Sequence, residues 1–365
     1  MKLRVFLSFF ILSIYAYAST ESCKELIHFG KLYRENPARV LANKIKLNNL
    51  KINNDRITYV VDELARMNAP ISAPTWDFPP YLIGSTDLED VFAFFLVVNS
   101  INYKYFVTGS TEEFRDGDLR EALLMATRVA DHWEELKKDN FKILREVDED
   151  YLNNFLFKAQ VPMPMLRSRV VALREVGLFL SQFHRPEKKV WENTLRELSP
   201  AALAYAIPFA LPSWKDPFLK RAQLTMFMVI GRARALGLDL FDQTAFSELT
   251  VASDYMLPRL DLALGLVEVL PGSPLLEMIE KKEAIQSGSE LETEIRAATV
   301  IVGDLMLEEM NKKKVWGEVD VTALDAMKWL LATGFHFDQS FLKNVQEKLF
   351  VQPMLPFHHT ETTDY

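Results

Sequence analysis

The chain has 365 residues, of which 49% are hydrophobic and 25% are charged, with a formal net charge of −8 and a pI near 5.5. This acidic balance argues against binding duplex nucleic acid through its phosphates, although a local basic pocket for a single nucleotide is compatible with it. The single cysteine, Cys23, excludes an intramolecular disulfide and a cysteine-based metal site, so the fold must be stabilised by its core.

Residues 1–18 have the pattern of a secretory signal peptide. Lys2 and Arg4 precede an apolar run, and the small-x-small sequence Ala16-Tyr17-Ala18 closes the segment. We expect cleavage after Ala18 and export of residues 19–365 to a periplasm or to the outside. The alternative is an uncleaved anchor, but about 14 apolar residues are fewer than the roughly 20 that a spanning helix needs. We expect no integral membrane segment after cleavage.

Helical periodicity extends over almost all of the mature chain. Residues 54–67 place Ile57, Val60, Val61 and Leu64 on one face of a helix. Residues 215–236 would form a helix that is apolar on nearly all sides, which is what a central buried helix requires. Similar patterns predict helices over residues 87–100, 118–137, 163–183, 259–269, 275–283, 289–311 and 321–332.

Only residues 102–108 alternate in the manner of an extended strand, with Tyr103, Tyr105 and Val107 at every second position. We find no repeat and no low-complexity linker. The predicted fold is therefore mainly α, a single compact helical domain over residues 19–365 with a small β-hairpin.

The standard catalytic signatures are absent. The chain has no G-x-S-x-G elbow, no P-loop and no H-E-x-x-H. His336 and Asp338 have no third ligand near them in the sequence, so a solvated or capping role is favoured over a metal site. We expect neither a metal nor a cofactor.

Asp254 stands at a junction in residues 249–261, LTVASDYMLPRLD. It follows an apolar run and precedes Pro258 by four residues, so one element ends and another begins near it. Aspartate is a preferred helix N-cap, and a proline near the first turn fits that role. A carboxylate at such a junction is also well placed as a reacting group. The pattern alone leaves both roles open, with capping the more frequent.

Six motifs in a fixed order resemble those of the queuosine salvage proteins. They are VVNSINYKYF at residues 97–106, LPSWKD at 211–216, FLKRAQ at 218–223, LTVASDYMLPRL at 249–260, ETEIRAA at 292–298, and PFHH at 356–359 with a final Tyr365. That family is known as the queuosine 5′-phosphate N-glycosylases, which hydrolyse the base-to-ribose bond of queuosine monophosphate and release queuine. The resemblance implies a largely helical fold like that of DNA glycosylases and an N-glycosyl hydrolase with a small-molecule nucleotide or nucleoside as substrate.

The resemblance makes Asp254 the candidate catalytic residue. Cleavage of an N-glycosidic bond builds positive charge on the ribose, which a nearby carboxylate stabilises while it activates water. Queuine has a carbon atom where guanine has N7, so protonation at that position cannot assist departure of the base. More of the work therefore falls on the carboxylate and on hydrogen bonds to the base.

The predicted substrate-binding residues are aromatic, polar or charged. Aromatic side chains would stack on the base, with ordinary core packing as the alternative, and Asn102 would read a base edge. Cations and a hydroxyl would hold the 5′-phosphate, with structural ion pairs as the alternative. Glu294, or Asp242, would pair with the cationic secondary amine of queuine, unless Glu294 and Arg296 orient other groups. The set is Asn102, Tyr103, Tyr105, Phe106, Trp214, Lys220, Arg221, Tyr255, Glu294, Arg296, His358 and Tyr365.

Two departures from the family pattern bear on the substrate. Met256 replaces an arginine after the Asp-Tyr pair, and His359 replaces the arginine that usually follows the C-terminal histidine. The lost positive charge makes a free nucleoside or a related 7-deazaguanine nucleotide an alternative to queuosine 5′-phosphate. A signal peptide is also unexpected for this family. The alternative function is an exported queuine- or nucleoside-binding protein that does not cut, and the third option is a protein that keeps only the fold.

Overall fold

The computed structural model describes residues 21–81, 83–110, 112–184, 186–238, 240, 246–334, 339–360 and 362–364. The predicted signal peptide, the site candidate Tyr365, and Asp242, His336 and Asp338 lie outside these described residues. Helices dominate the described part, and its strands are two or three residues long, so the mainly α prediction is confirmed. In that part, none of the helices combines the length and apolar character needed to cross a membrane.

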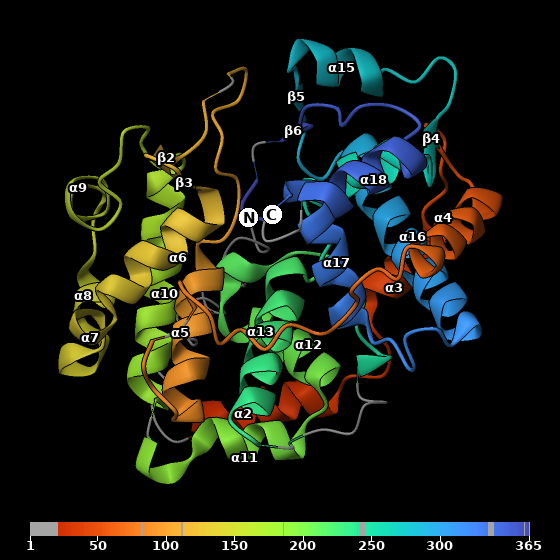
Figure 1. Cartoon of the computed structure of the whole chain (residues 1–365). Helices are drawn as coiled ribbons and strands as arrows, with labels where there is room; N and C mark the ends of the chain where they lie inside the picture. The colour runs from red at the N-terminus through yellow and green to blue at the C-terminus, as the bar shows by residue number, and fades with distance from the viewer. Residues whose placement is uncertain are drawn as a thin grey trace, which may run out of the picture.

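The N-terminal half contains most of the helices on one side of the molecule (Figure 1). Its elements are α2 (Glu21–Lys31), α3 (Pro37–Lys44), β1 (Leu50–Ile52), α4 (Asn54–Arg66), α5 (Leu88–Ser100), β2 (Arg115–Asp116), β3 (Leu119–Arg120), α6 (Glu121–Asp131), α7 (Trp133–Leu136), α8 (Lys138–Glu146), α9 (Glu149–Tyr151), η1 (Leu152–Leu156), α10 (Leu166–Phe183) and η2 (Pro186–Lys188).

The C-terminal half supplies the central helix and most of the other side of the molecule, which α3 and α4 of the N-terminal half complete. Its elements are α11 (Val190–Glu197), α12 (Pro200–Ala210), η3 (Pro212–Trp214), α13 (Lys220–Ala235), α14 (Met256–Ala263), β4 (Val267–Val269), α15 (Leu275–Lys281), β5 (Ala284–Ile285), α16 (Glu290–Lys313), α17 (Val321–Thr333), α18 (Gln339–Leu349) and β6 (His359–Thr360).

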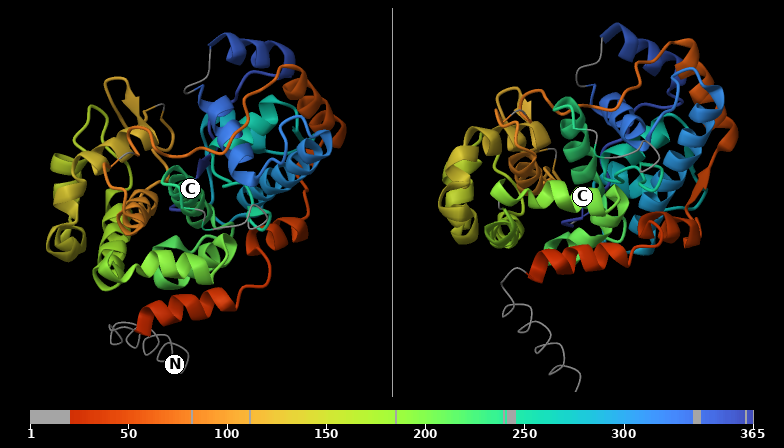
Figure 2. Two further views of the ribbon diagram at one scale, coloured as in Figure 1. Left: turned by 60° about the horizontal axis from the view of Figure 1, so that its bottom comes forward. Right: turned by 90° about the horizontal axis from the view of Figure 1, so that it is seen from below.

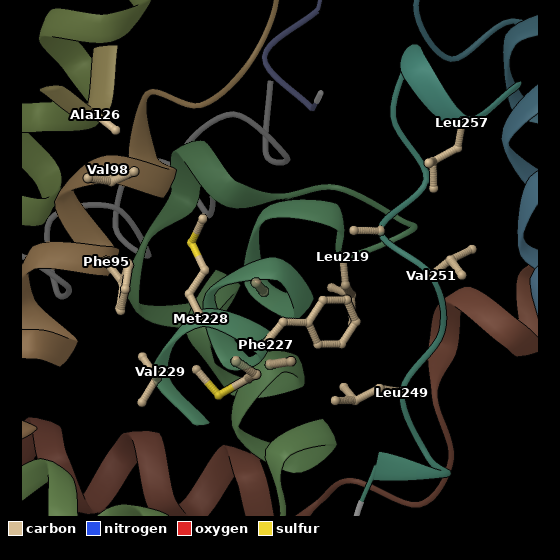
Figure 3. Close-up of a cluster of buried hydrophobic side chains, with 14 of the residues drawn as sticks. Phe95, Val98, Ala126, Leu219, Phe227, Met228, Val229, Leu249, Val251 and Leu257 are labelled. Atoms are coloured by element: carbon tan, nitrogen blue, oxygen red, sulfur yellow. The ribbon is translucent and has the colours of Figure 1, made fainter. Parts of the chain in front are cut away.

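Helix α13 lies between two groups of helices (Figure 1). Helices α5 to α10 lie on one side, and α3, α4, α14 and α16 to α18 lie on the other. α13 packs on α5 and α12, and its Phe227, Met228 and Val229 belong to one cluster with residues of α5 and of the segment before α14 (Figure 3). The apolar character of residues 215–236 therefore correctly predicted a central buried helix.

The start of α13 is fixed by a buried carboxylate. Asp216 accepts hydrogen bonds from the backbone N–H groups of Phe218 (2.9 Å) and Lys220 (2.7 Å), which satisfies donors that the first helical turn leaves free. Arg296 of α16 donates to both oxygens of Asp216, each at 2.8 Å. The pair thus connects the central helix to the second helical group.

A segment between α4 and α5, described over residues 67–81 and 83–87, crosses over α13 from one helical group to the other (Figure 2). It touches α13 at Gly231, where an added Cβ would lie 2.2 Å from the carbonyl oxygen of Pro74 and 2.7 Å from the Trp76 ring. Only glycine leaves room for this approach. The crossing segment is therefore seated directly on the central helix.

Helices α14 and α17 are joined by an ion pair that is closed off from water. Lys328 Nζ of α17 lies 2.7 Å from Asp261 Oδ1 of α14, and neither side chain is exposed. Burial raises the pKa of Asp261, and Lys328 acts in the opposite direction. Each buried charge is stabilised by the opposite charge of its partner.

The extended segment expected over residues 102–108 is not a strand. Its second part is nevertheless paired: Phe106 forms an isolated antiparallel bridge to Glu113, and backbone hydrogen bonds join Tyr105 to Phe114 and Val107 to Glu112. The hairpin of assigned strands is made by β2 and β3 further along. The first part differs because of Arg169 of α10, whose guanidinium donates to the backbone oxygens of Ile101, Tyr103 (2.6 Å) and Lys104 (2.7 Å). These carbonyls bind an arginine instead of a neighbouring strand.

The helix predicted over residues 259–269 is wrong in its bounds. α14 begins earlier, at Met256, and ends at Ala263, and the chain then forms β4, which pairs antiparallel with β1. The helix predicted over 118–137 is likewise divided into β3, α6 and α7. Near the C-terminus, β6 pairs in parallel with β5.

The Asp261–Lys328 pair leads to a prediction about stability. Replacing Lys328 with methionine leaves a buried carboxylate without its counter-charge, and we expect the free energy of unfolding to fall by about 3–5 kcal/mol. Urea denaturation followed by circular dichroism measures this. The matched control is Lys312→Met at the exposed end of α16, for which we expect a change within about 0.5 kcal/mol. Equal effects of the two substitutions would contradict this role for the pair.

Candidate active site

A cavity of about 700 Å³ opens between the two helical groups. It falls within the range of about 300–1,000 Å³ that is typical of small-molecule sites. Its walls come from the crossing segment, residues 102–105, the hairpin and the start of α6, α13, residues 252–259, α17 and Phe357. Segments from both halves of the chain are therefore needed to form it.

Asp254 lines this cavity just before α14. Its Oδ1 accepts the backbone N–H groups of Met256 (2.7 Å) and Leu257 (3.2 Å), so the capping role is confirmed. Among the described residues, no hydrogen bond to Oδ2 is found, and the side chain is only partly buried. One oxygen thus fixes the orientation of the carboxylate, and the other can meet a ligand.

Lys220 enters the cavity from the first turn of α13 and is 4% exposed. Its Nζ donates to the backbone oxygen of Asn102 at 3.0 Å. Burial lowers the pKa of Lys220 to about 8, and the nearby carboxylate of Asp254 opposes that shift. The amine and the Asp254 carboxylate are therefore close enough to interact electrostatically, and the amine can change its charge near neutral pH.

Asp325 of α17 is a second carboxylate in the cavity wall that sequence reasoning missed. Its Oδ1 accepts the backbone N–H of Ala252 at 2.7 Å, which fixes the segment leading to Asp254. Burial raises the pKa of Asp325 to about 7, and the charge of Asp254 adds to the shift. Its position within an apolar helical face gave no sign of this role.

Four predicted binding residues line the cavity beside these charged groups. They are Asn102, Tyr103, Tyr105 and Tyr255. The Tyr105 hydroxyl donates to Asn102 Oδ1 at 2.9 Å. The Tyr103 hydroxyl is buried with no hydrogen-bond partner among the described residues, so it remains available to a ligand. Three tyrosines and an amide therefore belong to the lining.

Three further predicted residues lie outside the cavity lining. Phe106 stacks on Phe357 with ring centroids 5.3 Å apart and meets Tyr255 edge-on. Trp214 is buried beneath the Arg221 guanidinium, which lies 5.3 Å from its ring centroid. Arg221 donates to the backbone oxygens of Ser100 (2.9 Å) and Ser213. In these positions the three side chains support the lining from behind.

Glu294, Arg296 and His358 also lie outside the lining. The Glu294 carboxylate accepts the backbone N–H groups of Asn49 (2.6 Å) and Leu50 (2.8 Å), and Arg296 is bound to Asp216. His358 is buried, and burial followed by the charge of Arg296 lowers its pKa to about 3. These motif residues have partners that organise the fold around the cavity.

Other lining residues carried no recognisable motif. The crossing segment contributes Trp76, Phe78 and Tyr81, of which Trp76 meets Tyr81 edge-on with centroids 5.0 Å apart. Glu121 and Arg259 add charged groups at another part of the wall. The density of aromatic residues in PTWDFPPY was the available signal for the first group, and nothing in the sequence singled out Glu121.

The helical fold and the cavity, with tyrosines beside two carboxylates and an amine, define a protein with a small-molecule active site. The family model "Queuosine salvage protein" matches residues 83–365, so the chain belongs to that family. A protein of Dictyostelium discoideum is 27% identical over 315 residues, covering 82% of this chain and 92% of its own length. One of Sphaerobacter thermophilus is 25% identical over 271 residues, covering 68% and 77%.

Both relatives are named queuosine 5′-phosphate N-glycosylase/hydrolase. At the level of the family, the chain is therefore a glycosyl hydrolase of queuosine salvage. The resemblance inferred from six short motifs is confirmed by a match that extends over most of the chain.

The raised pKa of Asp325 predicts how stability depends on pH. The folded state holds this proton more tightly than the unfolded state, so stability should fall as pH rises from about 4 to about 7, by up to about 1.4 kcal/mol per pH unit from one proton. Asp325→Asn keeps an oxygen for the N–H of Ala252 and cannot ionise. We expect it to flatten the decline in urea midpoints between pH 4.5 and 7.

The control for this experiment is Glu318→Gln, which removes an exposed carboxylate close to α17. It should leave the pH dependence unchanged. If Asp325→Asn and the parent lose stability in parallel over this range, then the Asp325 carboxyl does not hold its proton in the folded protein.

Proposed function

We propose that the chain hydrolyses the N-glycosidic bond of queuosine 5′-phosphate, or of a related 7-deazaguanine nucleotide or nucleoside, and releases queuine for salvage. The observation that carries this proposal is the oriented carboxylate of Asp254 in an aromatic-walled cavity. Membership of the family supports the class of reaction, and the names of the two relatives support the substrate.

Asp254 would act on the ribose. As the bond to the base lengthens, positive charge develops at the anomeric carbon and the ring oxygen, and a fixed carboxylate stabilises it without having to reorient. The oxygen not used for capping can accept a proton from the attacking water. Bonds to Met256 and Leu257 hold the group in place through the reaction.

Lys220 would act on the departing base. The leaving base takes up negative charge, and an ammonium group near Asp254 stabilises that charge in the transition state. Because the pKa of Lys220 is lowered to about 8, it can also donate a proton near neutral pH. Tyr103, Tyr105 and Tyr255 offer surfaces for the flat base and polar groups at its edges.

The 5′-phosphate would meet different cations from those first predicted. Arg221, Arg296 and His358 lie outside the lining, whereas Lys220, Arg120 and Arg259 belong to it. Because Lys220 is assigned to the base, Arg120 and Arg259 would provide the positive charge that a phosphate requires. A free nucleoside remains the alternative substrate, and a queuine-binding protein without turnover remains the alternative function.

Asp254→Asn tests the proposed reaction directly. Asparagine retains an oxygen that accepts the N–H groups of Met256 and Leu257, so the fold should persist while hydrolysis falls at least about a hundredfold. The assay follows queuine released from queuosine 5′-phosphate and, separately, from queuosine by chromatography. The matched control is Asp87→Asn at the start of α5, which alters another capping aspartate outside the cavity.

Each outcome of this assay has a distinct meaning. Release from the nucleotide that Asp254→Asn abolishes supports the reaction and its key residue together. Release from the nucleoside alone would change the proposed substrate, and retained activity in Asp254→Asn would remove that residue from the mechanism. Tight queuine binding by a folded protein that cuts neither compound would favour the binding alternative.

We also propose that residues 1–18 are a cleaved export signal, on the basis of their basic, apolar and small-residue pattern. The mature protein would then begin at Ser19. Intact-mass measurement of protein recovered from the native host, with separate analysis of cells and medium, tests this. Recovery of a form that retains residues 1–18 would contradict the proposal.

A further inference from the structure

One part of the cavity wall is acidic and has no role in the reaction described above. Glu113, Asp118 and Glu121 line it, all from the hairpin region and the start of α6. Pairing of β2 with β3 holds this region, and the backbone N–H of Glu121 donates to the oxygen of Phe114 at 2.9 Å. The Glu121 side chain is therefore carried on a fixed part of the backbone.

One oxygen of the Glu121 carboxyl group has no hydrogen-bond partner among the described residues. This atom, Oε1, is closed off from solvent, although other parts of the residue are exposed. An unsatisfied buried carboxyl group is costly. Glu121 also has a φ of +46°, a left-handed value that is strained for a residue with a side chain. A ligand that binds this carboxyl group would offset the first of these costs.

Arg259 and Arg120 are the cations that act on Glu121, and each opposes the rise in its pKa less strongly than burial and Glu113 cause it. Within the described part of the chain, Arg259 forms no ion pair with Glu121: the Arg259 Nε donates to the oxygen of Leu355 (2.6 Å), and its guanidinium lies 4.1 Å from the Phe357 ring centroid. Burial, and then the charge of Glu113, raises the pKa of Glu121 to about 8. The titratable and charged groups facing it are Glu113, Arg120, Asp254, Tyr105, Tyr255 and Arg259.

We propose that Glu121, assisted by Glu113, binds the cationic secondary amine that joins the cyclopentenediol of queuine to its base. This inference rests on the proposed function, because it assigns one part of that substrate to one part of the same cavity. A cation between two carboxylates relieves their mutual repulsion and satisfies the buried oxygen at once. The role first expected of Glu294 thereby passes to a residue whose carboxyl group is not already hydrogen-bonded.

The chemistry of the base supports the location. The bond to ribose and the aminomethyl branch leave the same five-membered ring and are separated by a single ring atom. A carboxylate that binds the amine must therefore be a neighbour of the carboxylate that acts on the anomeric carbon. Glu121 meets this requirement, because the charge of Asp254 contributes to its raised pKa. The amide edge of the base points away from this ring, so it is a poorer partner for Glu121.

Cation binding should be linked to loss of a proton. In the empty protein at pH 7 the Glu121 carboxyl group is mostly protonated, because its pKa is about 8. A bound ammonium group favours the ionised form, so binding releases part of a proton. Affinity for a cationic base should therefore rise as pH increases from 6 to 8, while affinity for a neutral base stays level.

The experiment compares two ligands of similar size in the full-length mature protein. One is 7-aminomethyl-7-deazaguanine, which is cationic, and the other is 7-cyano-7-deazaguanine, which is neutral. Isothermal titration calorimetry at pH 7.5, in buffers with different enthalpies of ionisation, measures both affinity and proton release. We expect the parent protein to bind the cation at least about tenfold more tightly than the neutral base, with proton release for the cation alone.

The variant Glu121→Gln should abolish this preference and the proton release while leaving affinity for the neutral base within about twofold. Glutamine has the same shape and removes a buried ionisable group, so it should not weaken the fold. The matched control, Glu112→Gln, removes an exposed charge on the same segment outside the cavity lining and should behave as the parent.

Two outcomes would overturn the inference. The first is equal affinity of the parent for both ligands, or an equal loss of affinity for both ligands in Glu121→Gln. Either result would show that Glu121 recognises no cation. Binding of the base by the parent, and with it the proposed function, would still stand. Failure of the parent to bind either base, together with failure to cut the nucleotide, would overturn the proposed function and this inference with it. Comparing the two ligands in the parent protein tests the inference even if the Glu121→Gln variant does not fold.

Discussion

The buried ion pair between Asp261 and Lys328 fixes the geometry on which the candidate site depends. Asp261 of α14 follows Asp254, which stands just before that helix, by seven residues, and Lys328 lies about one turn along α17 from Asp325. The ion pair between these two helices sets their register, and with it the position of the Asp254 carboxylate relative to the Asp325 carboxylate in the cavity. A buried pair adds little net stability compared with an apolar pair, so we infer that register is its main contribution.

The same side chain can serve the fold and the chemistry. Asp254 caps a helix through one oxygen and presents the other to the cavity, so the frequent role and the catalytic role predicted for it are compatible. Asp325 holds the preceding segment through a backbone N–H while its pKa is raised to about 7. In both cases a backbone hydrogen bond supplies the rigidity that electrostatic catalysis requires.

The sequence predicts the helices well because their burial has a simple period, and α13 was recognisable from its lack of a polar face. It could not predict that the backbone oxygens of Ile101, Tyr103 and Lys104 bind Arg169 instead of a strand, since that arginine lies more than 60 positions away. The motifs identified Asp254, Lys220 and three tyrosines of the lining, but gave the same weight to Glu294 and Arg296, whose charges are bound elsewhere. Glu121 belongs to no recognisable motif, because its role depends on its place in the cavity lining beside the β2–β3 hairpin.

The crossing segment has a further consequence. Pro74, Trp76, Phe78 and Tyr81 line the cavity, yet they precede residue 83, where the match to the family model begins. The similarity to the Dictyostelium discoideum protein covers 82% of the chain, which is more than residues 83–365 hold, so it extends over this wall. The cavity thus combines the part that holds Asp254, Lys220 and Glu121 with an aromatic wall seated on Gly231. Replacement of that wall would change the size of the ligand admitted while leaving the reacting groups untouched, which makes the crossing segment the natural place for substrate range to evolve.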